Sequence, residues 1–363
     1  MIRRLAVCSG IFLLMALSNA VVPVLDVFAI GPEEQGLVFS AYFFGATLMV
    51  LPAGMAADRF SRRRLMQVGL GVSLLAGLVI AVAPNVWSIV GARFVEGVAT
   101  GLFVSAGLAH VNSQADNGRS SGAFMASLNA GLLAGLILTG LLVELTGLRE
   151  AGVLAFASLS LLPFLFSFSL EQETVSGFHE PLVRLGPMLS QYHWLFYASL
   201  VMFGAGGAVT GLYPEFSNAD PGLLGVQIAL QNVATIVAVV VVSRLAIEPI
   251  PLIRACGGFM ALAVAVSFLT PYGFALIGAA GGAVQIATLL FLSRTGEPAG
   301  LGAGLFSTAS YAGMAILPPL ASVAARWVGY TMTFGLLVLV SITVAFTVQR
   351  CTRCRLDPSR LQG

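Results

Sequence analysis

The stretch that decides the fold is a short charged turn, Gly-Met-Ala-Ala-Asp-Arg-Phe-Ser-Arg-Arg-Arg at residues 54–64. It joins two apolar stretches, 36–57 and 66–83, and each is close to the ~20 residues that a helix needs to cross the hydrocarbon core of a bilayer. Basic residues near membrane spans are retained on the cytoplasmic side. The turn therefore predicts two membrane-spanning helices that are joined at the inner surface.

The composition extends this prediction to the whole chain. Of the 363 residues, 58% are hydrophobic and 9% are charged, against roughly 25% charged in soluble domains. The first apolar run, 5–29, continues past Ala20, so it predicts a span and not a cleaved secretory signal. Further spans are expected at 86–110, 122–145, 152–170, 194–213, 223–242, 253–270, 272–292, 300–323 and 327–348. The total is twelve, or eleven if Pro271 does not separate the ninth span from the tenth.

The spans form two groups of six around the longest polar stretch. We expect a first bundle at 1–170, a cytoplasmic linker at 171–193, a second bundle at 194–349 and a cytoplasmic tail at 350–363. Such a repeat predicts an all-α membrane protein with twelve transmembrane helices in two pseudo-symmetric six-helix bundles. It leaves no room for a soluble catalytic or nucleic-acid-binding domain.

The arginines predict the orientation, because the chain contains no Lys. With both termini inside, 15 of the 18 basic residues are cytoplasmic, and only Arg149 and Arg326 lie outside. The inner set is Arg3, Arg4, Arg59, Arg62, Arg63, Arg64, Arg119, Arg184, Arg244, Arg254, Arg294, Arg350, Arg353, Arg355 and Arg360. We therefore expect a multi-pass protein of the plasma membrane with both termini in the cytoplasm.

The charged turn closely resembles the cytoplasmic loop signature of the major facilitator superfamily, G-x-L-a-D-R-x-G-R-[KR], with Ser61 at the usual Gly. The resemblance implies a conformational latch between the two bundles, made by Gly54, Asp58, Arg59, Arg62 and Arg63 through ion pairs and helix ends. The alternative is a topology anchor that does no more than retain the turn inside.

A second charged motif lies within the predicted span 86–110. Arg93-Phe-Val-Glu96-Gly resembles the family pattern R-x-x-Q-G, with Glu96 at the usual Gln. Three residues apart, the two side chains share one face of a helix, and inside a bilayer they should face the protein interior and neutralise each other. Either Glu96 and Arg93 couple proton movement to transport, or the pair pins this helix to a neighbour.

A glycine pattern occupies the span 122–145. Gly122, Gly131, Gly135 and Gly140 resemble the antiporter signature G-x8-G-x3-G-P-x2-G-G of the drug-efflux branch, although Leu136 replaces its Pro and Thr139 one Gly. This favours export, whereas the alternative is close helix packing through small residues.

The first span carries Pro23-Val-Leu-Asp26, which is similar to the family's P-V-x-P. Asp26 is either a second proton-coupling carboxylate, facing the cavity, or the outer end of the helix.

Other polar residues inside predicted spans are candidates for lining a central cavity, because a polar group in hydrocarbon needs a partner. Those singled out are Asn19, Gln227, Gln231, Asn232, Gln285 and Tyr311, and ordinary interhelical hydrogen bonds are the alternative for each. Cys351 and Cys354 form a C-x-x-C in the tail, but two further zinc ligands would be required. We expect no metal and no cofactor.

These observations lead to one functional expectation with two alternatives. We expect a secondary active transporter that works by alternating access, is not an enzyme, and exports a small organic or lipophilic compound in exchange for protons. The first alternative is proton-coupled uptake of a metabolite, and the second is a receptor or lipid scramblase of the same shape. The expected partners are a small-molecule substrate, protons and the lipid bilayer, with no nucleic acid, and the protein is expected to be a monomer.

Overall fold

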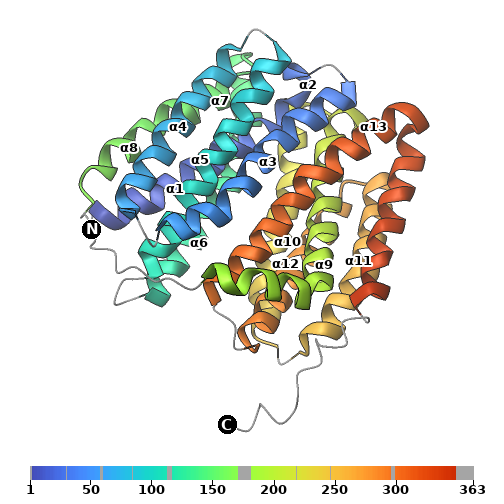
Figure 1. Ribbon diagram of the computed structural model, residues 1–363. Helices are drawn as coiled ribbons and strands as arrows, with labels where there is room; N and C mark the ends of the chain where they lie inside the picture. Colours follow the sequence, from blue (N-terminus) through green and yellow to red (C-terminus); the bar gives the residue numbers. More distant parts are fainter. Residues whose placement is uncertain are drawn as a thin grey trace.

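The protein was analysed as a computed structural model, which describes residues 2–29, 31–57, 60–83, 85–112, 117–170, 181–217, 219–245, 247–295 and 299–348. Across these ranges all regular structure is helical. Figure 1 shows the helices in two clusters, one from the amino-terminal half and one from the carboxy-terminal half.

The amino-terminal half contains six apolar crossings. Its helices are α1 (Ile2–Ala20), the 3-10 turn η1 (Val22–Val24), α2 (Leu25–Phe28), α3 (Gly31–Ala57), α4 (Arg62–Val82), α5 (Val86–Asn112), α6 (Asn117–Thr146), α7 (Ala151–Leu159) and α8 (Leu161–Ser167). The sixth crossing is divided at Ser160 into α7 and α8, which together form the apolar stretch Ala151–Ser167.

The described part of the carboxy-terminal half has five helical segments, of which α9 and α13 each contain a kink. They are α9 (Pro181–Ser217), α10 (Pro221–Ser243), α11 (Pro249–Leu269), α12 (Gly273–Ser293) and α13 (Ala299–Thr347). Within α13, Gly329 has a φ of 81°, a conformation that favours glycine, and it separates two crossings. Among the described residues ten helices are long and apolar enough to cross a membrane, and Ala151–Ser167 is a shorter apolar one. With α13 divided in two, this agrees with the twelve predicted crossings, and the predicted fold class is confirmed.

Three details of the predicted spans are wrong. The first α-helix ends at Ala20 instead of Ala29, because Pro23 lies in a 3-10 turn that follows it. The helix α9 begins at Pro181, so the second part of the predicted polar linker is helical, with a kink at Tyr192. The last two spans are two helices that meet at a kink at Gly329, a few residues after the predicted connection at 324–326. Residues 171–180 and the tail, with Cys351 and Cys354, lie outside the described residues.

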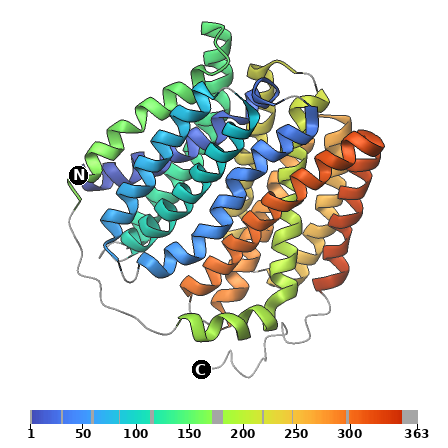
Figure 2. The same ribbon diagram turned by 45° about the horizontal axis from the view of Figure 1, so that its top comes forward.

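The two halves meet along two helix pairs. In both views α3 (blue) and α13 (orange) run side by side between the clusters (Figures 1 and 2), and these two helices pack extensively. The second pair is α6 and α10, also in contact. The central seam of the molecule therefore lies between α3 and α13 on one side and between α6 and α10 on the other.

Three large aromatic side chains are highly exposed at predicted outer ends of crossings. Trp87 begins α5, Tyr272 precedes α12, and Trp327 lies beside the Gly329 kink. Exposed Trp and Tyr are enriched at the membrane–water interface. Their positions are those expected for an aromatic belt on the outer side of the bilayer.

Candidate functional site

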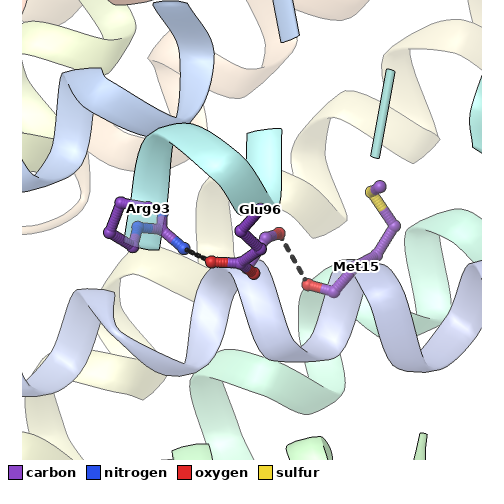
Figure 3. Close-up of polar contacts among 4 residues, drawn as sticks. Met15, Arg93 and Glu96 are labelled. Carbon is purple, nitrogen blue, oxygen red and sulfur yellow. Dashed lines mark hydrogen bonds and ion pairs between the residues drawn. The ribbon is translucent and has the colours of Figure 1, made fainter. Parts of the chain in front are cut away.

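A buried ion pair lies in the middle of α5. Arg93 Nη1 donates a hydrogen bond to Glu96 Oε2 at 2.7 Å, and the two side chains are only 1% and 0% exposed. Figure 3 shows both side chains on α5, pointing toward the backbone of α1 near Met15. The predicted pairing on one helix face, turned to the protein interior, is therefore what the structure contains.

The pair does not use all of its hydrogen-bonding capacity. Arg93 Nε and Glu96 Oε1 are both buried, and neither has a hydrogen-bond partner among the described residues. Above the ring of Tyr42 on α3, the guanidinium carbon of Arg93 lies 4.6 Å from the ring centroid. A cation in this position is attracted by the negative face of the ring. Tyr42 is thus a member of the site that the sequence did not single out.

Glycines bring α3 and α5 close enough to form this site. A Cβ atom on Gly97 would lie 1.8 Å from the backbone oxygen of Tyr42, and a Cβ on Gly45 would lie 2.1 Å from that of Phe94. Only glycine allows two backbones to approach so closely. Gly45 and Gly97 therefore hold the α3 backbone at Tyr42 against α5, close to the Arg93–Glu96 pair.

The other half approaches the site through α13. The rings of Phe43 on α3 and Tyr311 on α13 have centroids 6.1 Å apart, and Tyr42 packs edge-on against Phe43 at 5.0 Å. Of the six predicted cavity residues, Tyr311 is the one brought near the ion pair in this way.

The remaining cavity candidates have different surroundings. Asn19 Nδ2 donates to the backbone oxygen of Leu132 at 3.0 Å and joins α1 to α6. Gln231 Oε1 accepts a hydrogen bond from the Thr210 hydroxyl at 3.2 Å, within the second half. Both contacts agree with the alternative of ordinary interhelical hydrogen bonds. Gln227 has a buried Oε1 atom without a partner among the described residues, while Asn232 and Gln285 are half-buried.

Asp26 lies apart from the buried pair. Its side chain is exposed in the first turn of α2, beyond the 3-10 turn at Pro23. Of the two alternatives for this residue, its position agrees with the outer end of the first crossing, and not with a carboxylate beside Arg93 and Glu96.

The glycine pattern of α6 divides between two interfaces. A Cβ on Gly131 or Gly135 would lie 2.2 or 2.3 Å from a backbone oxygen of α1. Gly140 instead faces the other half, since its Cβ would be 2.6 Å from the Cα of Gly222 on α10. Gly122 has open space around it. Three of the four glycines therefore have the close-packing role that was the alternative to the antiporter signature.

The charged turn between α3 and α4 is described only in part. Asp58 and Arg59 lie outside the described residues, and a Cβ on Gly54 would meet open space. Arg62 Nε donates to the backbone oxygen of Ala57 at 3.4 Å, and Arg63 Nη2 donates to that of Phe168 at 2.7 Å. Both arginines thus bind carbonyl groups at helix ends of their own half, as a basic residue near a helix C-terminus does.

Polar contacts close the seam at the end that the sequence predicts to be the outer one. Gln35 Nε2 on α3 donates to Glu215 Oε2 on α9 at 2.7 Å, and Arg326 on α13 pairs with Glu33 on α3. The Glu144 carboxylate of α6 lies against Gly222, in the first turn of α10. The sequence places these residues at predicted outer ends, but it contains no signal for their partners across the seam.

The fold and this site agree with comparisons to known proteins. Residues 5–318 match the family described as the Major Facilitator Superfamily. The chain belongs to the major facilitator superfamily. It is a multi-pass membrane transporter and not an enzyme.

Solved structures of other superfamily transporters share this fold. A bacterial homolog of the human lysosomal transporter Spinster, in an inward-facing and occupied conformation, has a TM-score of 0.80 at 13% identity and covers 98% of both chains. A D-xylose-proton symporter has a TM-score of 0.72 at 13% identity and covers 96% of both chains. At this identity the likeness concerns the fold alone.

Relatives in sequence include drug-resistance proteins. The chain is 28% identical over 165 residues to the class C tetracycline resistance protein of Escherichia coli. The matched region covers 45% of this chain and 41% of that protein. It is also 28% identical over 220 residues to the puromycin resistance protein of Streptomyces alboniger. That match covers 59% of this chain and 41% of the relative. The matched region thus spans about two fifths of the length of each relative.

Proposed function

We propose that this superfamily member works by alternating access and exports a small organic or lipophilic compound in exchange for protons. Glu96 is the carboxylate that binds and releases the proton, and Arg93 stabilises its charged form. The observation that carries the proposal is the buried Arg93–Glu96 pair, in which one carboxylate oxygen has no hydrogen-bond partner among the residues that the structure describes. An ionisable residue at this depth is costly, and in transporters such residues mark proton pathways.

The mechanism follows from the change of charge at Glu96. When the carboxylate is ionised, its attraction for Arg93 holds the pair closed. When it is protonated, the attraction is lost, and Arg93 and the α3 side chains around it can rearrange. A proton shifts the balance between inward-open and outward-open states only if its affinity differs between them. The Arg93–Glu96 pair supplies this difference in proton affinity if the movement of the two halves changes the position of Arg93.

Export is supported by the drug-resistance relatives. We place the protein in the plasma membrane with both termini in the cytoplasm, as the arginine distribution favours. The turn with Gly54, Asp58, Arg59, Arg62 and Arg63 then lies at the inner surface, where we propose that it latches the inward-closed state.

Uptake in symport with protons is the second candidate. It is favoured by similarity to the arabinose-proton symporter of Bacillus subtilis, at 25% identity over 99 residues. This match is shorter than those to the drug-resistance relatives and covers 27% of this chain.

The test uses the full chain reconstituted in liposomes and a panel of fluorescent dyes and antibiotics. An inward-directed or outward-directed proton gradient is applied, and movement of each compound is measured. In the Glu96→Gln variant, flux driven by the gradient is expected to fall by about 5- to 150-fold, the usual range of a coupling between two sites. Exchange of the same compound without a gradient is expected to persist, because the carboxamide retains the shape of the side chain.

The matched control is Glu248→Gln, which removes an exposed carboxylate between α10 and α11. It should transport like the parent. Flux that a gradient drives equally well in parent and Glu96→Gln would refute the role of Glu96. A gradient that drives no compound in the parent would favour the receptor or scramblase alternative.

A further inference from the structure

Tyr42 contacts both the buried ion pair and the group through which the other half approaches it. The guanidinium carbon of Arg93 lies 4.6 Å from the centroid of its ring, and the ring packs edge-on against Phe43, which in turn contacts Tyr311. The side chain is 4% exposed. Tyr42 belongs to α3, whereas the ion pair belongs to α5 and Tyr311 to α13. One residue therefore connects three helices at the seam.

The ring compensates for hydrogen bonds that Arg93 does not make. Arg93 uses Nη1 toward Glu96, while its buried Nε has no partner in the described part of the chain. With so few hydrogen bonds, the orientation of the guanidinium depends on the surface against which it lies. That surface is the face of Tyr42, whose backbone is held against Gly97 on α5. The position of Arg93 relative to Glu96 thus depends on the Tyr42 ring.

The contact with α13 relates this position to the seam. Phe43, the neighbour of Tyr42, packs against Tyr311, and Ser40 one turn earlier donates a hydrogen bond to the backbone oxygen of Met314. The face of α3 that carries the ring is therefore next to the face that α13 covers. A displacement of α13 against α3 would therefore change the surroundings of Tyr42.

We propose that Tyr42 is a positioning residue whose ring holds the Arg93 guanidinium against Glu96 and makes this arrangement sensitive to the closing of the α3–α13 seam. The proposal rests on the proposed proton coupling at Glu96. Tyr42 itself neither gains nor loses a proton in this role.

The sign of the expected effect follows from the groups around Glu96. The charged or titratable groups are Arg93 on its own helix and Tyr42 on α3, with Tyr311 on α13 acting on Tyr42. On α1, Met15 lies beside Glu96 and does not titrate (Figure 3). A well-placed Arg93 favours the ionised carboxylate. When the ring is removed, Arg93 is less well placed, so Glu96 binds a proton at higher pH. The midpoint of any conformational change driven by Glu96 should move upward.

A reporter cysteine makes this midpoint measurable without a known substrate. A Cβ on Gly211 would lie 3.5 Å from Phe39 and 3.7 Å from Pro318, which is ordinary contact across the outer seam. Gly211→Cys should therefore be tolerated and should react with a membrane-impermeant maleimide only when the outer seam opens. Its labelling rate is measured in right-side-out vesicles across a pH series. Each rate is divided by that of the same protein denatured at the same pH, and the parent without the reporter gives the background.

In the reporter protein, Tyr42→Leu is expected to raise the labelling midpoint by about one pH unit, the equivalent of a tenfold change in proton affinity. Tyr42→Phe retains the ring and should keep the midpoint of the reporter protein. Phe44→Leu is the matched control, because it removes an exposed ring from the same helix, one that packs against Phe94 of α5. If Tyr42→Leu does not fold, Tyr42→Met replaces it, since the flexible side chain fills the same space without a ring.

The outcomes separate this proposal from the one on which it rests. Labelling that is independent of pH, or unchanged in its pH dependence by Glu96→Gln, would refute proton coupling at Glu96. If Glu96→Gln abolishes the pH dependence but Tyr42→Leu and Tyr42→Met leave the midpoint in place, the positioning role of Tyr42 is overturned. The same holds if Tyr42→Phe shifts the midpoint as far as Tyr42→Leu, because the ring would then not be the decisive group.

Discussion

Replacing Arg93 by Met is expected to lower the free energy of unfolding by about 3–5 kcal/mol, because it leaves the Glu96 carboxylate buried without an opposite charge. Methionine has a similar length and packs well in an apolar interior, so little of the loss should come from a cavity. The measurement is the thermal unfolding midpoint of the detergent-solubilised protein, followed by the exposure of its buried Cys256.

The double variant Arg93→Met and Glu96→Gln is the decisive comparison. It removes both charges, and replacing a whole buried pair by neutral groups is often close to neutral for stability. Most of the loss should therefore be recovered. Arg326→Gln serves as the control at an exposed ion pair, where a change below about 1 kcal/mol is expected. A single variant as stable as the parent would mean that Arg93 does not neutralise Glu96 in the folded protein.

Gly97→Val is expected to prevent the folded state from forming. Its Cβ would lie 1.8 Å from the backbone oxygen of Tyr42, and its nearest neighbours are backbone atoms of Tyr42 and Ala46, which cannot rotate away. Separating α3 from α5 at this point also removes Tyr42 from Arg93. The cost should be more than about 3 kcal/mol, above the usual range for overpacking, because two helices must move apart. The measurement is the yield of monodisperse protein in size-exclusion chromatography.

The control for this substitution is Gly91→Val, on the same helix. A Cβ on Gly91 meets open space, so the same change in residue type should leave the yield of folded protein near that of the parent. Equal yields for Gly97→Val and the parent would show that α3 and α5 do not approach as closely as described.

Most of the fold could be predicted from the sequence, because the length of an apolar run and the basic residues of a turn are local properties of the sequence. The crossings from 36 to 145 begin and end within a few residues of the predicted positions, since the apolar runs end at charges or turn-forming residues. The first crossing was predicted too long because an apolar sequence continues across Pro23, and hydropathy is insensitive to the backbone constraint of proline. The helical part of the linker was missed because its polar composition hides the start of α9.

The site could be predicted only as far as its members share one helix. Arg93 and Glu96 are three residues apart, so their pairing follows from helix geometry. Tyr42 is one of several aromatic residues in an apolar helix, and nothing in the local sequence distinguishes the ring that faces α5 from those that face lipid. The partners Gln35 and Glu215 lie 180 residues apart and meet only because the two bundles pack together.

The connection between the last two crossings has a practical consequence for work with this protein. Because the two parts of α13 meet at the Gly329 kink, the surface predicted to be the outer one offers no long loop at this point for a protease to cleave or for an epitope tag to occupy. An insertion there would have to break a helical hairpin rather than lengthen a connection. Surface probes on the outer side are better attached near Arg149, between α6 and α7, where the chain leaves helical structure for several residues.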